Sequence, residues 1–362
     1  MIAVTLALEL LLMTMVGFFA RKRGIVNETF AGQLTSFVMR IILPMLIFHS
    51  IRGSVEFTAE ALRDCGIAVA AGFLVMLFSL GTGQLLWKMT GKGGDGRIIR
   101  YAAAFTHFSF MGIPVVEALF GGTGTMYYAF FITPVRIFYY ALSEPLMTPP
   151  VEKTEADSDS ADVPAAPPET ESDAAEVSAA PQETEAAAKD IRAGEQKSSA
   201  GKQLLKKTLT NPALIAVALG ILFWVTGWKI PAVPDYVIRQ CAAMSSPLGL
   251  ILCGLTLGNY DLKALFTFDN LKIPFIRLVV LPAAALAVVM PVTRLCGLNP
   301  MLGQIIIIYM ALPAASLLPA YAMRYDPDEK NHFLAAGASV LSTLFSLATL
   351  PVWYMVLTAG WM

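Results

Sequence analysis

Few ionisable side chains lie inside the long apolar stretches of this sequence, and these few are the first candidates for chemistry. Arg136 lies in "FFITPVRIFYYAL", and His107 precedes Pro114 by seven residues. A guanidinium stays charged and binds a carboxylate through two parallel hydrogen bonds, whereas an imidazole titrates near physiological pH. We therefore expect Arg136 to hold an anion or to pair with Glu144 or Glu9. His107 is expected to bind the solute or a coupling proton, or to be a neutral histidine bonded to a neighbouring helix.

Further candidates lie in or beside the same stretches. Glu9, in the first stretch, is either a proton carrier or a structural glutamate, because ionisable groups inside a membrane face an interior or a cavity. Arg40 stands four residues before Pro44. Ser109 and Ser316 lie close to prolines, where their hydroxyls would bind a solute or join neighbouring helices.

Motifs for other classes of protein are absent. The sequence contains no G-x-S-x-G, no Walker loop, no H-E-x-x-H and no C-x-x-C. We expect no enzyme, no cofactor, no metal site and no nucleic-acid partner. Since no nucleotide-binding loop is present, an ion or solute gradient must drive any transport through this chain, unless it is a uniporter.

The composition indicates which elements position these residues. The 362 residues are 56% hydrophobic and 15% charged, against about 25% charged in soluble domains. Apolar runs of about 20 residues are long enough to cross a bilayer core. We expect an all-α integral protein of the cell membrane, embedded in the lipid bilayer, with ten transmembrane helices at about 2–20, 34–51, 66–88, 98–119, 126–147, 211–228, 236–257, 271–292, 301–322 and 333–357.

The charges predict the orientation and an inserted segment. Seventeen Lys and Arg fall in one alternate set of connections, Lys272 and Arg277 among them, and five fall in the other set. The positive-inside rule places the richer set in the cytoplasm and both termini outside. Residues 148–202 hold 13 of the 27 acidic residues and few large apolar ones, so we expect a disordered cytoplasmic linker between membrane repeats 1–147 and 203–362. A regulatory role of this linker is the alternative.

Four prolines reveal an internal repeat. Pro44 and Pro114 are 70 residues apart, and Pro247 and Pro313 are 66 residues apart. Five spans in each half make the two repeats inverted, a layout common in secondary transporters. We expect the fourth and ninth helices to be broken near Pro114 and Pro313 and to cross at mid-membrane, with Gly112 allowing close approach. The half-helix N-termini would then attract an anion; ordinary proline kinks are the alternative.

Several segments also resemble a known family. "VGFFARKRGIVNETFAGQLTSFVMRIILPMLIFHSI", "FSFMGIPVVEALFG", "IRLVVLPAAAL" and "ALPAASLLPAYAMRYDPDE" resemble the auxin efflux carrier family, which includes bacterial malate and malonate permeases and plant PIN-type carriers. The resemblance implies ten spans in two inverted repeats, crossed broken helices, transport of organic anions such as malate, and an elevator-like movement. It also suggests a homodimer by analogy. The chain departs from the family pattern at His107, Arg136 and Ser316, where members usually carry Asn, and at Ser143, where they usually carry Gly.

Two rival functions stay open at this point. A sodium-coupled symporter or exchanger of the same fold would use backbone carbonyl, Ser and Thr oxygens as ligands. A membrane receptor would instead use the acidic linker to recruit a cytoplasmic partner. The leading hypothesis is a secondary carrier of a small organic anion, driven by a proton or another gradient.

Overall fold

The computed structural model describes residues 2–53, 55–90, 94–148, 211–326 and 328–361, and the regular secondary structure of this part of the chain is helical, apart from one isolated β-bridge. The expected linker at 148–202 lies outside the described residues, apart from its first residue. In the first half the helices are α1 (Ile2–Lys22), α2 (Glu28–Phe37), α3 (Leu43–Gly53), α4 (Ala59–Thr90), α5 (Gly94–Ala104) and α6 (Ile113–Met147). In the second half they are α9 (Pro212–Thr226), α10 (Ala232–Ala243), α11 (Ser245–Gly258), α12 (Leu262–Leu265), α13 (Phe268–Phe275), α14 (Leu281–Leu295), α15 (Pro300–Ala311), α16 (Leu318–Tyr325) and α17 (Glu329–Trp361).

Many of these helices are suited to a membrane. Within the described residues, six are long and apolar enough to cross a bilayer: Thr29–Gly53, Ala59–Thr90, Phe108–Ser143, Ala232–Gly258, Phe268–Leu295 and Glu329–Ala359. Pro212–Thr226 and Pro300–Ala311 are shorter apolar helices. The prediction of an all-helical, multi-pass membrane protein is confirmed. The length and composition of single helices identify six spans among the described residues, so they do not confirm the expected arrangement of ten.

Three wide, π-helical turns interrupt the regular helices, and each ends two residues before a proline. They are η1 (Val38–Ile42), η2 (Phe108–Gly112) and η3 (Ile276–Val280), before Pro44, Pro114 and Pro282. Proline has no amide donor, and its ring displaces the carbonyl four residues earlier. The carbonyl of Leu278, four residues before Pro282, accepts a hydrogen bond of 2.7 Å from the Trp353 indole instead. At Pro282, a neighbouring helix thus satisfies a backbone group that the proline releases.

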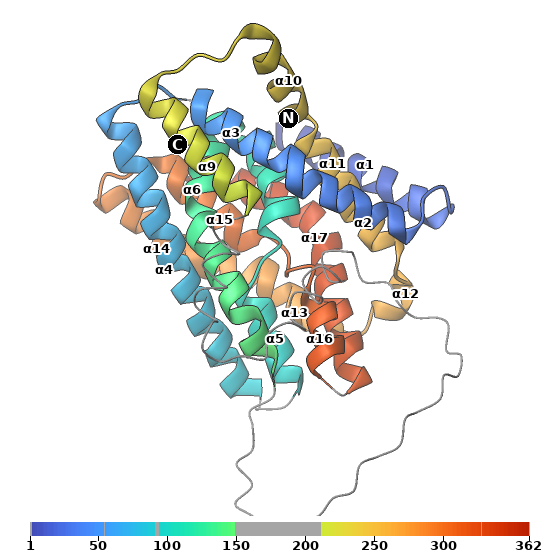
Figure 1. Cartoon of the computed structure of the whole chain (residues 1–362). Coiled ribbons are helices and arrows are strands. Elements are labelled where there is room, and N and C mark those ends of the chain that lie inside the picture. Colours follow the sequence, from blue (N-terminus) through green and yellow to red (C-terminus); the bar gives the residue numbers. More distant parts are fainter. Residues whose placement is uncertain (1, 54, 91–93, 149–210, 327, 362) are drawn as a thin grey trace, which may run out of the picture.

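The helices form two groups that pack against each other (Figure 1). In the first group, α1 packs along α11 and α3 packs along α9. In the second group, α4 packs with α5 and α6, α14 packs with α15, and α17 packs with α13 and α16. The groups meet where α3 contacts α6, where α11 contacts η2, and where α1 contacts α17. A boundary between two packed units is therefore present inside the protein.

Two interrupted helices meet inside the second group. The helical path stops after Ala104 at the end of α5 and after Ala311 at the end of α15. The two extended segments that follow pair in antiparallel fashion at Thr106 and Ala314. The His107 amide donates to the Pro313 carbonyl at 2.9 Å, and the Ala315 amide donates to the Phe105 carbonyl at 3.2 Å. The two interruptions therefore meet, as the prolines predict.

The position of the first interruption differs from the expectation. Pro114 is the second residue of α6 and lies after the break, which spans residues 105–107. Because η2 continues directly into α6, Pro114 lies in the second turn of a helix that begins at Phe108, and the wide turn of η2 ends two residues before it. The interruption therefore lies before Pro114 and not at this proline. Pro313, by contrast, lies within its interruption. α6 then turns at Gly121, whose φ of 63° lies in the left-handed region.

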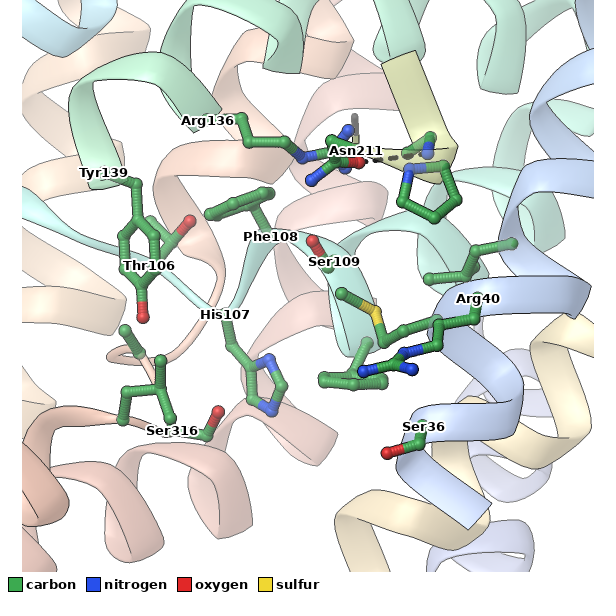
Figure 2. Close-up of a pocket in the computed structure, with 17 residues that line it drawn as sticks. Ser36, Arg40, Thr106, His107, Phe108, Ser109, Arg136, Tyr139, Asn211 and Ser316 are labelled. Atoms are coloured by element: carbon green, nitrogen blue, oxygen red, sulfur yellow. Dashed lines mark hydrogen bonds between the residues drawn. The ribbon is translucent and has the colours of Figure 1, made fainter. Parts of the chain in front are cut away.

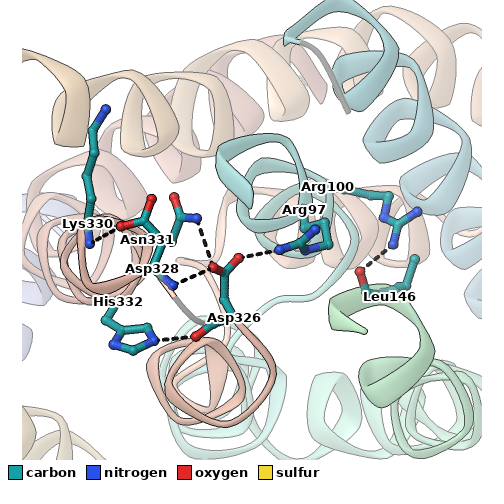
Figure 3. Close-up of polar contacts among 8 residues, drawn as sticks. All are labelled: Arg97, Arg100, Leu146, Asp326, Asp328, Lys330, Asn331 and His332. Carbon is teal, nitrogen blue, oxygen red and sulfur yellow. Dashed lines mark hydrogen bonds and ion pairs between the residues drawn. The ribbon is translucent and has the colours of Figure 1, made fainter. Parts of the chain in front are cut away.

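A buried ion pair holds the far end of α5 against the segment between α16 and α17 (Figure 3). The Arg97 guanidinium lies 2.6 Å from the Asp326 carboxylate, and both side chains are buried. The Asn331 side chain and the Asp328 amide donate to the other carboxylate oxygen at 3.0 and 3.1 Å. Burial alone would raise the pKa of Asp326, but these hydrogen bonds and the Arg97 charge outweigh it and hold the pKa below the usual value.

Candidate functional site

A cavity of about 250 Å³ lies between the two helix groups, next to the crossing (Figure 2). The first group supplies residues from α2, η1, α3 and the start of α9, and the second supplies residues from the crossing and from α6. The lining residues are Ser36, Met39, Arg40, Leu43, Thr106, His107, Phe108, Ser109, Phe110, Arg136, Tyr139, Asn211, Pro212, Ala213, Ala315, Ser316 and Leu317. Both units thus contribute to one small compartment.

The charge of this cavity is one-sided. Arg40 and Arg136 line it together with His107, and its described lining contains no Asp or Glu. Arg136 is 4% exposed, and its guanidinium carbon lies 5.8 Å from the centre of the Phe108 ring. Arg40 reaches in from η1, and the His107 ring points into the space between Arg40 and Ser316 (Figure 2). Two fixed positive charges without a lining carboxylate favour an anion.

Two helix N-termini add partial positive charge beside the cavity. η2 begins at Phe108 and continues directly into α6, while α16 begins at Leu318. Residues of the first turn or just before it, namely Ser109 and Ser316, line the cavity. The first amides of a helix have no partner within it and carry a partial positive charge. An anion in the cavity would lie close to both helix starts.

Gly112 makes the close approach at the crossing possible. A Cβ atom at this position would lie 2.1 Å from the Tyr128 hydroxyl and 2.9 Å from a methyl group of Leu312. The Tyr128 hydroxyl also donates to the Phe108 carbonyl at 2.9 Å. Gly112, Pro114 and Pro313 do not line the cavity, so they shape the crossing rather than contact a bound solute.

Arg277 is a functional candidate that the sequence analysis missed. It is 1% exposed, and its Nε and one Nη donate to the carbonyls of Leu312 and Ala103, each at 3.0 Å. The expectation that Arg277 belongs to a cytoplasmic connection was therefore wrong. The apolar neighbours in "PFIRLVV" resemble those of Arg136, and this was the signal that marked a buried arginine.

Other predicted residues lie away from the cavity. Glu9 is exposed on α1, Pro44 lies in α3 directly after η1, and Pro247 is the third residue of α11. None of the three lines the cavity. The side chain of Glu144 is outside the described part of the structure. Conversely, the cavity includes Asn211, whose side chain caps α9 by accepting from the Ala213 amide at 3.0 Å.

These features define the class of the protein as a multi-pass membrane transporter. A family model described as a membrane transport protein matches residues 2–354, and the chain belongs to this family, which is the auxin efflux carrier family. The resemblance seen in the sequence is thereby confirmed.

Two relatives span the same length. An uncharacterized transporter of Methanothermobacter thermautotrophicus is 23% identical over 354 residues, which cover 97% of each chain. An uncharacterized transporter of Methanocaldococcus jannaschii is 23% identical over 362 residues, which cover 99% of each chain. These similarities support transport rather than enzymatic activity, and the relatives' names specify no substrate.

Proposed function

We propose that this transporter is a secondary carrier of a small organic anion, a mono- or dicarboxylate such as malate, and that the anion binds in the cavity beside the crossing. The observation that carries the proposal is the lining itself. Arg40, Arg136 and His107 face a space without lining carboxylates, beside two helix starts. A carboxylate in this space would accept charge-assisted hydrogen bonds from the guanidinium groups.

The size of the cavity supports a small solute. Pockets for drug-sized ligands have volumes of about 300–1,000 Å³, and this cavity has about 250 Å³. A second cavity of about 50 Å³ adjoins it and shares His107, Phe110, Ser316 and Leu317. We infer that the smaller cavity is part of the route by which the solute leaves.

The arrangement of the helices supports an elevator-like movement. The cavity is lined by both helix groups, so a shift of one group against the other would change the side to which it opens. We further infer the ten-span, inverted-repeat arrangement, in which α5 with η2 and α15 with α16 are the broken fourth and ninth spans. Cytoplasmic placement of the linker, both termini outside, the plasma membrane as location and a homodimer belong to the same proposal.

The test is uptake by purified protein in liposomes. Labelled mono- and dicarboxylates, amino acids and indole acids would be offered with imposed proton or sodium gradients. Arg136→Ala should abolish uptake of whichever anion is carried, while Arg63→Ala, an exposed arginine outside the cavity, should leave it intact. Equal uptake by wild type and Arg136→Ala would remove the arginine from the site.

A deletion separates the carrier from the receptor hypothesis. A chain that lacks residues 150–200 should transport at the wild-type rate if the linker only connects the two repeats. A receptor would give two other results. The wild type would transport no solute in liposomes, and the shortened chain would no longer bind a cytoplasmic partner that the wild type binds.

A further inference from the structure

Arg277 places a buried positive charge directly behind the crossing. Its donors reach the Ala103 carbonyl at the end of α5 and the Leu312 carbonyl just after α15, each at 3.0 Å. The third guanidinium nitrogen is buried and has no hydrogen-bond partner in the described residues. Arg277 does not line the cavity, so the charge serves the two helix ends and not the solute.

The two helix ends are a natural site for a cation. The last carbonyls of a helix have no partner within it and carry a partial negative charge. Two such ends meet here, since α5 and α15 both stop at the crossing. In transporters with discontinuous helices, carbonyls of this kind coordinate the coupling sodium ion. The same chemistry serves a guanidinium, which has five donors and stays charged.

We propose that Arg277 is a tethered cation, which occupies the carbonyl site at the two helix ends and makes transport independent of sodium. This inference rests on the proposed carrier function and adds to it that the carrier needs no sodium ion. η3 packs with α13, α14 and α17 of the second group, which also contains the crossing. The half-helix ends therefore keep their counter-charge whether or not a solute is bound. Arg277 acts as a positioning residue, because it touches the crossing and not the solute cavity.

Chemical rescue tests the proposal without any transport assay. Arg277→Ala leaves two buried carbonyls without their donors, and the apparent melting temperature of the purified protein should fall by about 5 °C or more. Guanidinium chloride at a few millimolar, far below denaturing concentrations, should restore at least half of that loss. Wild type and Arg63→Ala should not respond, because neither has an empty site. The melting temperature of Arg277→Lys, which keeps the charge, should lie between those of the wild type and Arg277→Ala. The lysine variant replaces Arg277→Ala in this comparison if the alanine variant fails to fold.

Sodium provides the second arm. The melting temperature of the wild type should be the same in NaCl and in N-methylglucamine chloride of equal concentration. An upward shift specific to sodium, or failure of guanidinium to stabilise Arg277→Ala more than Arg63→Ala, would overturn the proposal. If rescue succeeds but no anion is taken up into liposomes, the proposed substrate class fails and the role of Arg277 stands.

Discussion

The amide of His107 donates a hydrogen bond of 2.9 Å to the carbonyl of Pro313, a residue 206 positions further along the chain. This bond joins two helices at the places where each is interrupted. It also sets the positions of the side chains that follow. His107 and Ser109 follow one side of the crossing, Ser316 follows the other, and all three line the same cavity. The crossing is thus the element that brings the candidate site together.

A designed disulfide tests the crossing. Thr106 and Ala314 are directly opposite in a pair flanked by the two hydrogen bonds, a geometry with a Cα separation of about 4.5 Å, within the disulfide range. With the four native cysteines changed to serine, Thr106→Cys/Ala314→Cys should cross-link under mild oxidation. A protease site placed in the linker makes the product visible as an uncut chain on a gel. Each single cysteine variant is the control, and a double variant that is cleaved as completely as the controls would speak against the crossing.

Gly112 should tolerate no side chain. Gly112→Ala would force the new Cβ against the Tyr128 hydroxyl, which lies 2.1 Å from that position, and overpacking of this kind costs about 1–3 kcal/mol. The melting temperature and anion uptake should both fall. Gly66→Ala is a matched control, since no atom lies within 4 Å of its added Cβ, and it should be neutral or slightly stabilising. Equal effects of the two changes would contradict the close contact.

The two cavity arginines should contribute unequally. Arg136 is buried, whereas Arg40 is exposed. Water therefore competes less with an anion for the Arg136 guanidinium than for the Arg40 guanidinium. Because a hydrogen bond to a charged group contributes about 1.5–3 kcal/mol, Arg40→Ala should raise the half-saturating anion concentration by up to about tenfold, whereas Arg136→Ala should abolish uptake at every anion concentration offered. Saturation curves in liposomes, recorded for the wild type and for each variant, make the comparison. A larger effect at Arg40 would reverse this assignment.

Acid should destabilise the protein through Asp326. The pKa of this carboxyl is held below its usual value in the folded state, so its stabilising effect is complete above the unfolded pKa of about 4 and is lost as the pH falls through the lower folded value. Asp326→Asn should lower stability at pH 7 by about 3 kcal/mol, the order found when a buried pair is broken. The difference in stability between Asp326→Asn and the wild type should shrink as the pH is lowered from 7 to 3. Asp269→Asn is the control: it removes an exposed pair with Lys272 and should change the free energy of unfolding little. A difference in stability between the wild type and Asp326→Asn that stays constant with pH would contradict the account.

The sequence predicts the crossing through the prolines, because proline removes a backbone donor wherever it stands. It does not predict on which side of a proline the helix breaks. Pro114 lies inside the helix that follows its break, whereas Pro313 lies within a break, and this difference depends on which partner the freed carbonyls find. Gly112 could be predicted, since a glycine two residues before a proline in an apolar stretch indicates close approach.

The sequence predicts the charged wall of the cavity only in part. Arg136, Arg40 and His107 stand out because charged and titratable groups are rare in apolar runs. Arg277 was assigned to a connection because other basic residues lie nearby, and its partners are main-chain carbonyls, which leave no trace in the sequence. Asn211 reaches the cavity only through packing of α9 against η1, a contact between segments far apart in the chain.

The central claim is that an anion binds where the two helix starts face the cavity. The most direct test is an electron cryomicroscopy map of the protein saturated with the anion that liposome uptake identifies, compared with a map of Arg136→Ala under the same conditions. We predict density between Arg136, His107 and Ser316 in the wild type and none in the variant. Solute density elsewhere in the wild type, with this cavity empty, would contradict the account.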